Sequence, residues 1–441
     1  MVLPTDSPLG EAKRSFASTI LAYCIALPLF GRAVFPLARD KAHISLASSF
    51  TDPQIVATYL AAAVVAIGLC TTSNRSTQSK RGRVALMFMF FVTACLVSSF
   101  GSNFPLLAVW RSFEIFVLGL WVIVMIRNAA NTGDWFQAIR GFYAVSVGIL
   151  MGVLIGLIIN PSGAWAVEGE IARLTGTTGY SINSNDIGTI AAVLAVGSFL
   201  RAVERGGVKF FVATALFIGV CYLSYSRASY IALAIGFVAA TAMLGRLDGR
   251  RMFAFFVSFC AALCIVAAVL VSHEIRDQLL FLMTRGHGAE NFESFGGRLQ
   301  LWELGLKVFG EHPFLGTGYG TYPEGLQGGH FHNVIVELLV TTGTVGTVAY
   351  VAFVLTLIGA IKGAIRRTNR NTAAERIAAA DLVTISIIII TANGATTGAA
   401  HYSWDLLGLM SVAVSASALM SRQGMASEQR PARAQFGNLL R

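Results

Sequence analysis

Residues 328–346 read GGHFHNVIVELLVTTGTVG, and in this stretch a polar segment passes directly into a long apolar run. The apolar run continues to about residue 361, which is long enough to cross a hydrocarbon core of about 30 Å as a helix. Its first residues include His332 and Asn333, and Glu337 follows slightly more than one turn later. The sequence therefore predicts a membrane helix that begins with an unusual group of polar side chains.

The composition of the whole chain is that of a membrane protein. Of its 441 residues, 55% are hydrophobic and only 13% are charged, whereas soluble domains average roughly 25% charged residues. We predict an all-α integral membrane protein with about twelve transmembrane helices and a large loop that contains an amphipathic helix. The expected spans are residues 16–36, 54–70, 84–100, 104–126, 141–160, 187–203, 208–224, 229–245, 252–272, 333–361, 379–398 and 403–420.

These spans divide the chain into four parts. Residues 1–272 hold the first nine helices, with a short loop at 161–186 on the non-cytoplasmic side. Residues 273–332 form the large loop on the same side, residues 333–420 hold the last three helices, and residues 421–441 form a cytoplasmic tail. Loops as long as these two are usually functional.

Basic residues are distributed unevenly between the two sides of the predicted bundle. Of the 33 Lys and Arg residues, 23 fall in the alternate loops on the side of the N-terminus or at the span ends next to them, 8 on the other side and 2 further inside spans. The positive-inside rule then predicts that both termini are cytoplasmic. We interpret the basic loops as topology signals rather than as a nucleic-acid site, although the net charge is +10.

The large loop contains a helical pattern of its own. The stretch RLQLWELGLKVFGEHPF, bounded by Gly310 and Pro313, predicts an amphipathic helix on or near the outer membrane–water interface. It is followed by GTGYGTYPEGLQGG, whose six glycines permit tight turns or the close approach of backbone to a ligand.

Three arginines on the non-cytoplasmic side need an explanation, because few basic residues occur there. Arg173 lies in the short loop, Arg227 in SYSRASY between two spans, and Arg298 at the start of the amphipathic helix. The connection around Arg227 is so short that the guanidinium must lie at or just under the membrane surface, where an unpaired charge costs several kcal/mol. A partner carboxylate, snorkelling to the headgroups or an anionic ligand would each account for it. Arg111 and Glu114 are three residues apart and are expected to pair with each other.

His332 is a candidate general base. Histidine is the side chain best suited to accept a proton near neutral pH, and a helix start presents its ring to the aqueous loop. Asn333 can cap the helix or position a substrate hydroxyl, and Glu337 lies about 7.5 Å further along the axis, close enough to orient a partner. A histidine beside an asparagine cap is also ordinary without any catalytic role, so the spacing alone leaves both interpretations open.

The combination of these residues favours a particular chemistry. The sequence contains one candidate base, several arginines and no cluster of Asp, Glu and His that would hold a divalent metal. A lipid donor that leaves as a diphosphate would then be neutralised by the arginines, which grip phosphate oxygens bidentately. The predicted reaction is transfer from an activated lipid phosphate to a hydroxyl.

Four stretches resemble motifs shared by the O-antigen ligases, and the layout of spans extends this resemblance over essentially the whole chain. They are HNVIVELLVTTG, SRAS, GGRLQLWELGLKVFGEHPFLGTGYGTYP and RLTGTTGYSINSND. The chain departs from the family in the last stretch, where Asn183-Ser184-Asn185 stands in place of the more usual Asn-Pro-Asn, and His330 matches no motif position.

The resemblance implies a GT-C-like glycosyltransferase of the bacterial inner membrane that is inverting, independent of metal and free of other cofactors. It would move O-antigen from undecaprenyl diphosphate to a sugar hydroxyl of the lipid A-core, in an active site that faces the periplasm. In this interpretation His332 is the general base. The donor diphosphate is held by Arg227 and Arg298, with Arg173 as a third contact, and Asn333 and Glu337 support the site.

Other functions share some of these features. An O-antigen polymerase or a protein O-oligosaccharyltransferase of the same superfamily would use a similar set of residues with a different acceptor. A transporter of lipid or polysaccharide would instead predict charged residues near the bilayer midplane in two related halves, and a scaffold would leave Arg227 and the polar helix start unexplained. We therefore expect a ligase.

Overall fold

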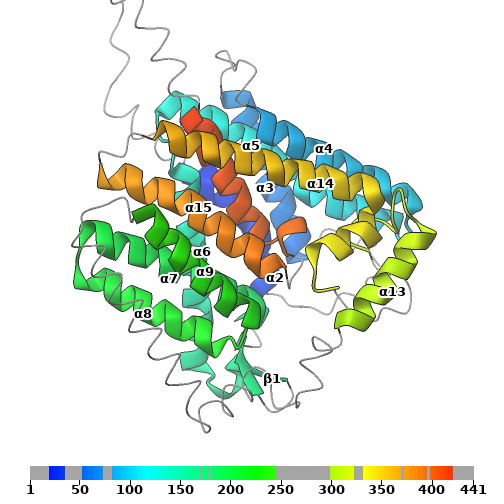
Figure 1. Ribbon diagram of the computed structural model, residues 1–441. Coiled ribbons are helices and arrows are strands. Elements are labelled where there is room, and N and C mark those ends of the chain that lie inside the picture. Colours follow the sequence, from blue (N-terminus) through cyan, green and yellow to red (C-terminus); the bar gives the residue numbers. More distant parts are fainter. Residues whose placement is uncertain are drawn as a thin grey trace, which may run out of the picture.

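A computed structural model describes residues 19–34, 52–72, 82–168, 171–177, 180–244, 298–321, 331–368, 372–394 and 398–420. This part of the chain is mostly helical (Figure 1), as predicted. Seven of the described helices are long and apolar enough to cross a membrane. They are α3 (Pro53–Thr71), α4 (Arg83–Ser98, continued by the 3-10 turn η2, Ser99–Gly101), α5 (Pro105–Thr132), α6 (Gln137–Ile159), α7 (Ser184–Arg205), α9 (Arg227–Leu244) and α14 (Val334–Arg367).

Further helices occupy most of the other predicted spans. Shorter apolar helices cover Thr19–Phe30, Val208–Leu223 (α8) and Trp404–Met420, and α2 (Leu27–Val34) continues the first of these. Helix α15 (Ala373–Asn393) lies at the eleventh predicted span. The predicted span at 252–272 and the first part of the large loop lie outside the described residues, so the number of twelve stays a prediction.

Two short β-hairpins in the loop at 161–186 are the exception to the all-helical prediction. Strand β1 (Trp165–Glu168) pairs antiparallel with β2 (Ile171–Leu174), and β3 (Gly176–Thr177) pairs antiparallel with β4 (Tyr180–Ser181). The 3-10 turn η3 (Ser162–Ala164) precedes them. Pairing gives the backbone groups of this connection the partners that a long irregular loop would lack.

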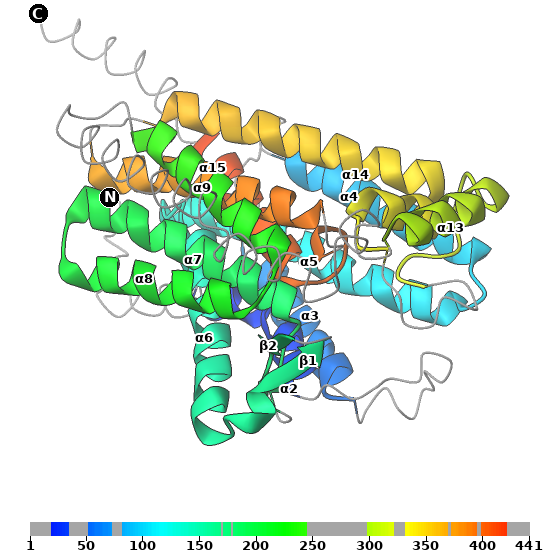
Figure 2. The ribbon, with the colours of Figure 1, turned by 60° about the horizontal axis from the view of Figure 1, so that its bottom comes forward.

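The helices pack as two groups around the last described helix. Helix α7 packs against α8, α9 and α15, whereas α4 packs against α5 and α14. Residues 404–419 of helix Trp404–Met420 are all buried, which makes it the centre of the bundle. Figure 2 shows α6 running steeply across the direction of α14.

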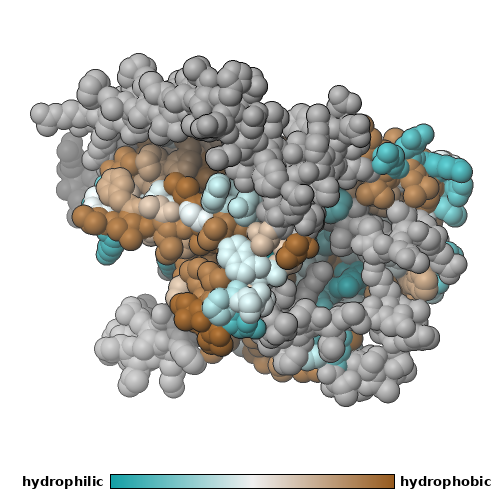
Figure 3. Space-filling view, turned by 90° about the horizontal axis from the view of Figure 1, so that it is seen from below, coloured by the Kyte–Doolittle hydropathy of each residue, from teal (hydrophilic) through white to brown (hydrophobic). Residues whose placement is uncertain are grey.

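Large apolar side chains are exposed on the outside of several helices. Examples are Leu60 and Ile67 on α3, Phe90 on α4, and Phe211 and Val212 on α8. Apolar side chains gather on the face of the molecule in Figure 3. Patches of this kind on a chain with this composition are surfaces that lipid covers.

Helix α14 is broken at Gly343, and a loop fills the break. Gly343 has φ 63° and ψ −164°, which is not a helical conformation. The N–H of Thr344 donates to the carbonyl of Pro313 at 2.8 Å, and the N–H groups of Thr317 and Gly318 donate to the carbonyls of Val340 and Thr341, both at 2.9 Å. Backbone groups that the break removes from the helix are thus satisfied by the loop at 313–318.

The loop also explains why glycine stands at these positions. A Cβ on Gly343 would lie 2.3 Å from the carbonyl oxygen of Phe314, and a Cβ on Gly316 would lie 2.5 Å from that of Val340. The glycines expected to allow close backbone approach therefore do so toward α14 of the same chain.

Helix α13 (Arg298–Glu311) packs beside the first part of α14, as Figures 1 and 2 show. Its buried Gly305 lies against the ring of Phe331, since a Cβ there would approach that ring to 2.7 Å. Leu299, Leu304 and Leu306 remain exposed. The predicted amphipathic helix is confirmed as a helix, with Gly310 inside its last turn, and its place at the membrane surface stays a prediction.

We expect Gly343→Ala to lower the stability of the protein, because the backbone of alanine would have to keep a positive φ and its Cβ would clash with the carbonyl oxygen of Phe314. Strain at a position of this kind costs about 1–3 kcal/mol. Gly359→Ala is the matched control, since Gly359 lies in the same helix and a Cβ there meets nothing within 4 Å. Thermal unfolding in detergent should show a lower midpoint for Gly343→Ala alone, and equal midpoints would contradict the account of the break.

Candidate functional site

His332 lies two residues before the start of α14, in a strained conformation. Its φ is 51°, in the left-handed region, which costs an L-residue roughly 1–2 kcal/mol. Its side chain is partly buried. Strain of this kind persists only where the surrounding structure imposes it, so the groups that hold this backbone are part of the site.

The residue before His332 is held on both sides. Phe331 is fully buried, and its carbonyl accepts a hydrogen bond of 2.7 Å from the indole Nε1–H of Trp302 on α13. Its N–H donates to Oε2 of Glu337 at 3.4 Å. Helices α13 and α14 therefore fix the backbone from which His332 projects.

Asn333 caps α14. Its Oδ1 accepts hydrogen bonds from the N–H groups of Ile335 at 2.9 Å and Val336 at 3.2 Å, which confirms the predicted cap. Its Nδ2 donates to the carbonyl of Gly394 at 3.3 Å, at the end of α15. The start of α14 is thereby joined to the end of α15.

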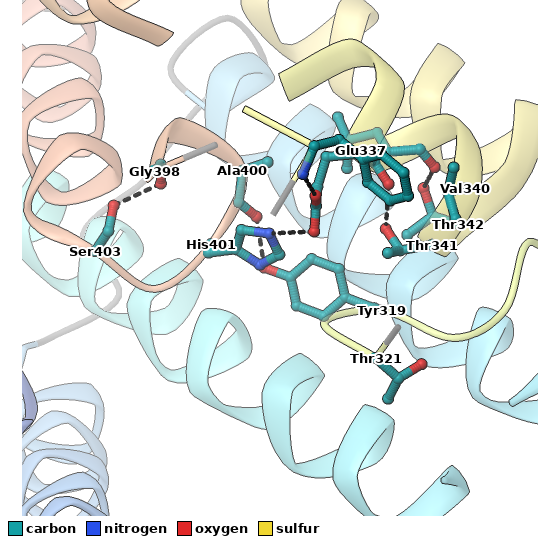
Figure 4. Close-up of polar contacts among 12 residues, drawn as sticks. Tyr319, Thr321, Glu337, Val340, Thr341, Thr342, Gly398, Ala400, His401 and Ser403 are labelled. Carbon is teal, nitrogen blue, oxygen red and sulfur yellow. Dashed lines mark hydrogen bonds and ion pairs between the residues drawn. The ribbon is translucent and has the colours of Figure 1, made fainter. Parts of the chain in front are cut away.

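Glu337 meets a partner that the sequence analysis did not identify. The carboxylate is fully buried, and its Oε1 lies 3.2 Å from Nε2 of His401 (Figure 4). His401 follows the 3-10 turn η4 (Gly398–Ala400), directly before helix Trp404–Met420. Glu337 was expected to orient a partner, and it contacts both His401 and the backbone of Phe331.

Tyr319 completes this cluster from the glycine-rich loop. Its ring stacks on that of His401 with centroids 5.4 Å apart, and its hydroxyl donates to the carbonyl of Ala400 at 2.5 Å. The N–H of Tyr319 donates to Oγ of Ser98 at 3.0 Å. Burial raises the pKa of the Tyr319 phenol well above its ordinary value, so the hydroxyl keeps its proton and remains a donor.

Arg173, in the loop at 161–186, is held by hydrogen bonds to other parts of the chain. Arg173 on β2 is buried, and its Nε donates to the carbonyl of Ser224 at 3.2 Å while its Nη2 donates to Oδ1 of Asn185 at 2.8 Å. Ser224 lies three residues before Arg227, so the hairpin region meets the start of α9. Tyr225, between them, has a positive φ of 48°.

Arg227 and Arg298 are the first residues of α9 and α13, and both are partly buried. Arg298 lies one turn before Trp302, whose indole holds the backbone beside His332. The structure thus brings Arg298 to the His332 side of α13, and Arg173 to the residues before Arg227. Their predicted contact with a diphosphate stays a prediction.

The residues around His332 and those around Arg173 and Arg227 lie at the same end of the bundle. Arg201, late in α7, pairs with Asp381, early in α15, at 3.0 Å, so these helices run antiparallel and the end of α15 lies beside the start of α7. Ser229 Oγ donates to the carbonyl of Asn185 at 3.3 Å, which joins the start of α9 to the start of α7. We call the region where α7, α9 and α14 begin and α15 ends the His332 end.

Three further observations from the sequence can be compared with the structure. Arg111 and Glu114 form the expected ion pair at 2.9 Å. Asn183 caps α7 through a bond of 2.8 Å from the N–H of Asn185, and Ser184 is the first helical residue, a position that proline also suits. The departure from Asn-Pro-Asn therefore leaves the local fold compatible with the family pattern. His330 lies outside the described residues.

Within the described ranges, no three His, Cys, Asp or Glu side chains gather closely enough to hold a metal ion. That the reaction needs no metal stays a prediction, which rests on the arginines that would neutralise the leaving diphosphate.

A comparison with known families gives one match. Residues 212–351 match the model of a family described as O-antigen ligase. The match covers about a third of the chain, and it shows that this segment is similar to the O-antigen ligases. The matched segment contains His332, Arg227 and Arg298, whereas Arg173 and His401 lie outside it. A search among proteins with curated descriptions found no match.

We expect Arg173→Ala to destabilise the protein, because it leaves the Ser224 carbonyl and the Asn185 side chain without this donor. A buried polar group left without its partner costs about 1–3 kcal/mol. Thermal unfolding of wild type and variant in detergent checks this. An unchanged midpoint together with weaker donor binding would instead assign Arg173 to the ligand alone.

Proposed function

We propose that this chain is an inverting, metal-independent glycosyltransferase that transfers O-antigen polysaccharide from undecaprenyl diphosphate to a sugar hydroxyl of the lipid A-core. It acts in the bacterial inner membrane with its active site toward the periplasm and both termini in the cytoplasm. The observation that carries the proposal is the strained His332, held by α13 and capped α14, inside the segment that matches the O-antigen ligases. The superfamily itself implies polysaccharide and lipid-linked substrates.

The proposed reaction is a single displacement at the anomeric carbon of the donor. An imidazole nitrogen of His332 accepts the proton of the acceptor hydroxyl, whose oxygen forms a bond to that carbon. The bond between the carbon and the diphosphate oxygen breaks, and undecaprenyl diphosphate leaves with the electron pair. Attack opposite the leaving group inverts the anomeric configuration. A positioned base of this kind contributes about 10²–10⁴-fold to the rate.

The positions of the other residues support the roles proposed for them. Arg227 is the first residue of α9 and Arg298 the first of α13, and a helix start favours anions through its dipole in addition to the guanidinium charge. The two arginines bind the donor diphosphate and stabilise the charge that develops on it. Arg173 is a third contact, Asn333 positions the acceptor, and Glu337 fixes the backbone on which His332 sits.

We expect His332→Ala to reduce transfer about 10²–10⁴-fold, because the acceptor hydroxyl loses its base. The matched control is His312→Ala, since His312 is exposed at the end of α13. The measurement mixes each purified protein with undecaprenyl-diphosphate-linked glycan and lipid A-core in the presence of a chelator, and follows higher-mass lipopolysaccharide on a gel. A fully active His332→Ala protein would refute the proposed role.

The same assay separates the alternatives. A lipid-linked glycan that grows, with no product on the lipid A-core, would indicate an O-antigen polymerase. Transfer only to a Ser or Thr peptide would indicate a protein O-oligosaccharyltransferase. Movement of the lipid-linked glycan between leaflets without any transfer would indicate a transporter.

We expect Arg227→Lys and Arg298→Lys to lower kcat/KM for the lipid-linked donor about tenfold or more. Lysine keeps the charge but loses the bidentate grip, and one charge-assisted hydrogen bond contributes about 1.5–3 kcal/mol. Arg140→Lys is the control, because the Arg140 side chain is 59% exposed and pairs with Asp134 near the start of α6. The hairpin region that carries Arg173 follows the other end of α6. Initial rates over a range of donor concentrations test this, and wild-type values in both variants would exclude these arginines from donor binding.

A further inference from the structure

We propose that His401 is a positioning residue for His332, acting through Glu337 and the backbone of Phe331; this inference rests on the proposed role of His332 as the base. His401 lies outside the matched O-antigen ligase segment and far from His332 in sequence. The contact that joins it to the site is the pair of His401 Nε2 and Glu337 Oε1, 3.2 Å apart.

The first step of the argument is the burial of Glu337. Its side chain is fully inaccessible, and a carboxylate in such a place needs donors around it. His401 supplies one of them, and the Phe331 N–H at 3.4 Å supplies another. The Glu337 carboxylate therefore contacts both the side chain of His401, which is distant in the sequence, and the backbone N–H of Phe331, beside His332.

The second step is that packing against Tyr319 holds the ring of His401 in place. Its ring is 18% exposed and stacks on Tyr319. Tyr319 is in turn fixed at both ends, by its hydroxyl on Ala400 and by its N–H on Ser98.

The third step is the strained backbone of His332. A left-handed residue relaxes when the groups on either side are released. The Phe331 carbonyl is held by Trp302 and its N–H by Glu337, so loss of His401 weakens the attachment of the Phe331 N–H. Because a shift of about 1 Å in a reacting group can reduce a rate about 10²-fold, this is enough to affect the base.

The first experiment measures the backbone without using activity. Hydrogen exchange is followed for the amides of residues 331–336 in wild type, His401→Ala, His401→Gln and the control His312→Ala. We expect faster exchange at these amides in His401→Ala alone. Glutamine keeps a donor at the end of a side chain of similar reach, so His401→Gln should resemble wild type. Unchanged exchange in His401→Ala would overturn the proposal.

The second experiment measures transfer kinetics with the same proteins. We expect His401→Ala to lower kcat about 10–100-fold with KM for the lipid-linked donor within about twofold of wild type, and His401→Gln to recover most of the rate. In the His332→Ala background, His401→Ala should cause no further loss, because the two residues act as one unit.

The outcomes separate the two proposals. A His401→Ala protein with wild-type kcat, or one whose loss persists in full in the His332→Ala background, would contradict the positioning role. A general loss of structure would lower the unfolding midpoint of His401→Ala and accelerate exchange throughout the chain, which also contradicts it. If wild-type protein transfers no glycan, the proposed function fails, and the exchange experiment still decides whether His401 holds this backbone.

Discussion

The rest of the His332 end depends on the break in α14 at Gly343. Inside a membrane each backbone polar group without a partner costs several kcal/mol, so a break in a spanning helix is stable only if other backbone fills it. The loop at 313–318 does this through N–H groups and carbonyls of its own. In doing so it fixes the end of α13 and carries Tyr319 to His401. The break also separates a short first part of α14, which bears Asn333 and Glu337, from the part that crosses the bilayer.

The candidate site is assembled from segments that are distant in the sequence. Trp302, Asn333 and Glu337 hold the backbone around His332, and their own partners are Phe331, Gly394 and His401. Arg173 joins the hairpin region to the residues before Arg227. Most of these links are hydrogen bonds to backbone atoms, and the contact between Glu337 and His401 joins two side chains. The position of His332 therefore depends on hydrogen bonds that hold the backbone beside it.

Sequence reasoning predicted what depends on local spacing. The cap by Asn333, the Arg111–Glu114 pair and helix α13 each arise from residues within one or two turns of one another. The break at Gly343 was not predicted, because glycine is common in membrane helices and only the incoming loop reveals its φ of 63°. His401 was not predicted either, since its contact with Glu337 joins two helices whose relative placement no local pattern encodes. The hairpins at 165–181 are too short to give a clear alternating pattern.

Residues 404–419 of helix Trp404–Met420 are buried on every side, yet this helix follows all the other described helices in the sequence. Those helices therefore reach their final packing only after this one has been made. His401 lies just before this helix in the sequence, so its contact with Glu337 also forms late. A nascent chain that already contains His332 and Glu337 therefore lacks one of the contacts near the backbone of His332 until the residues around His401 have been added.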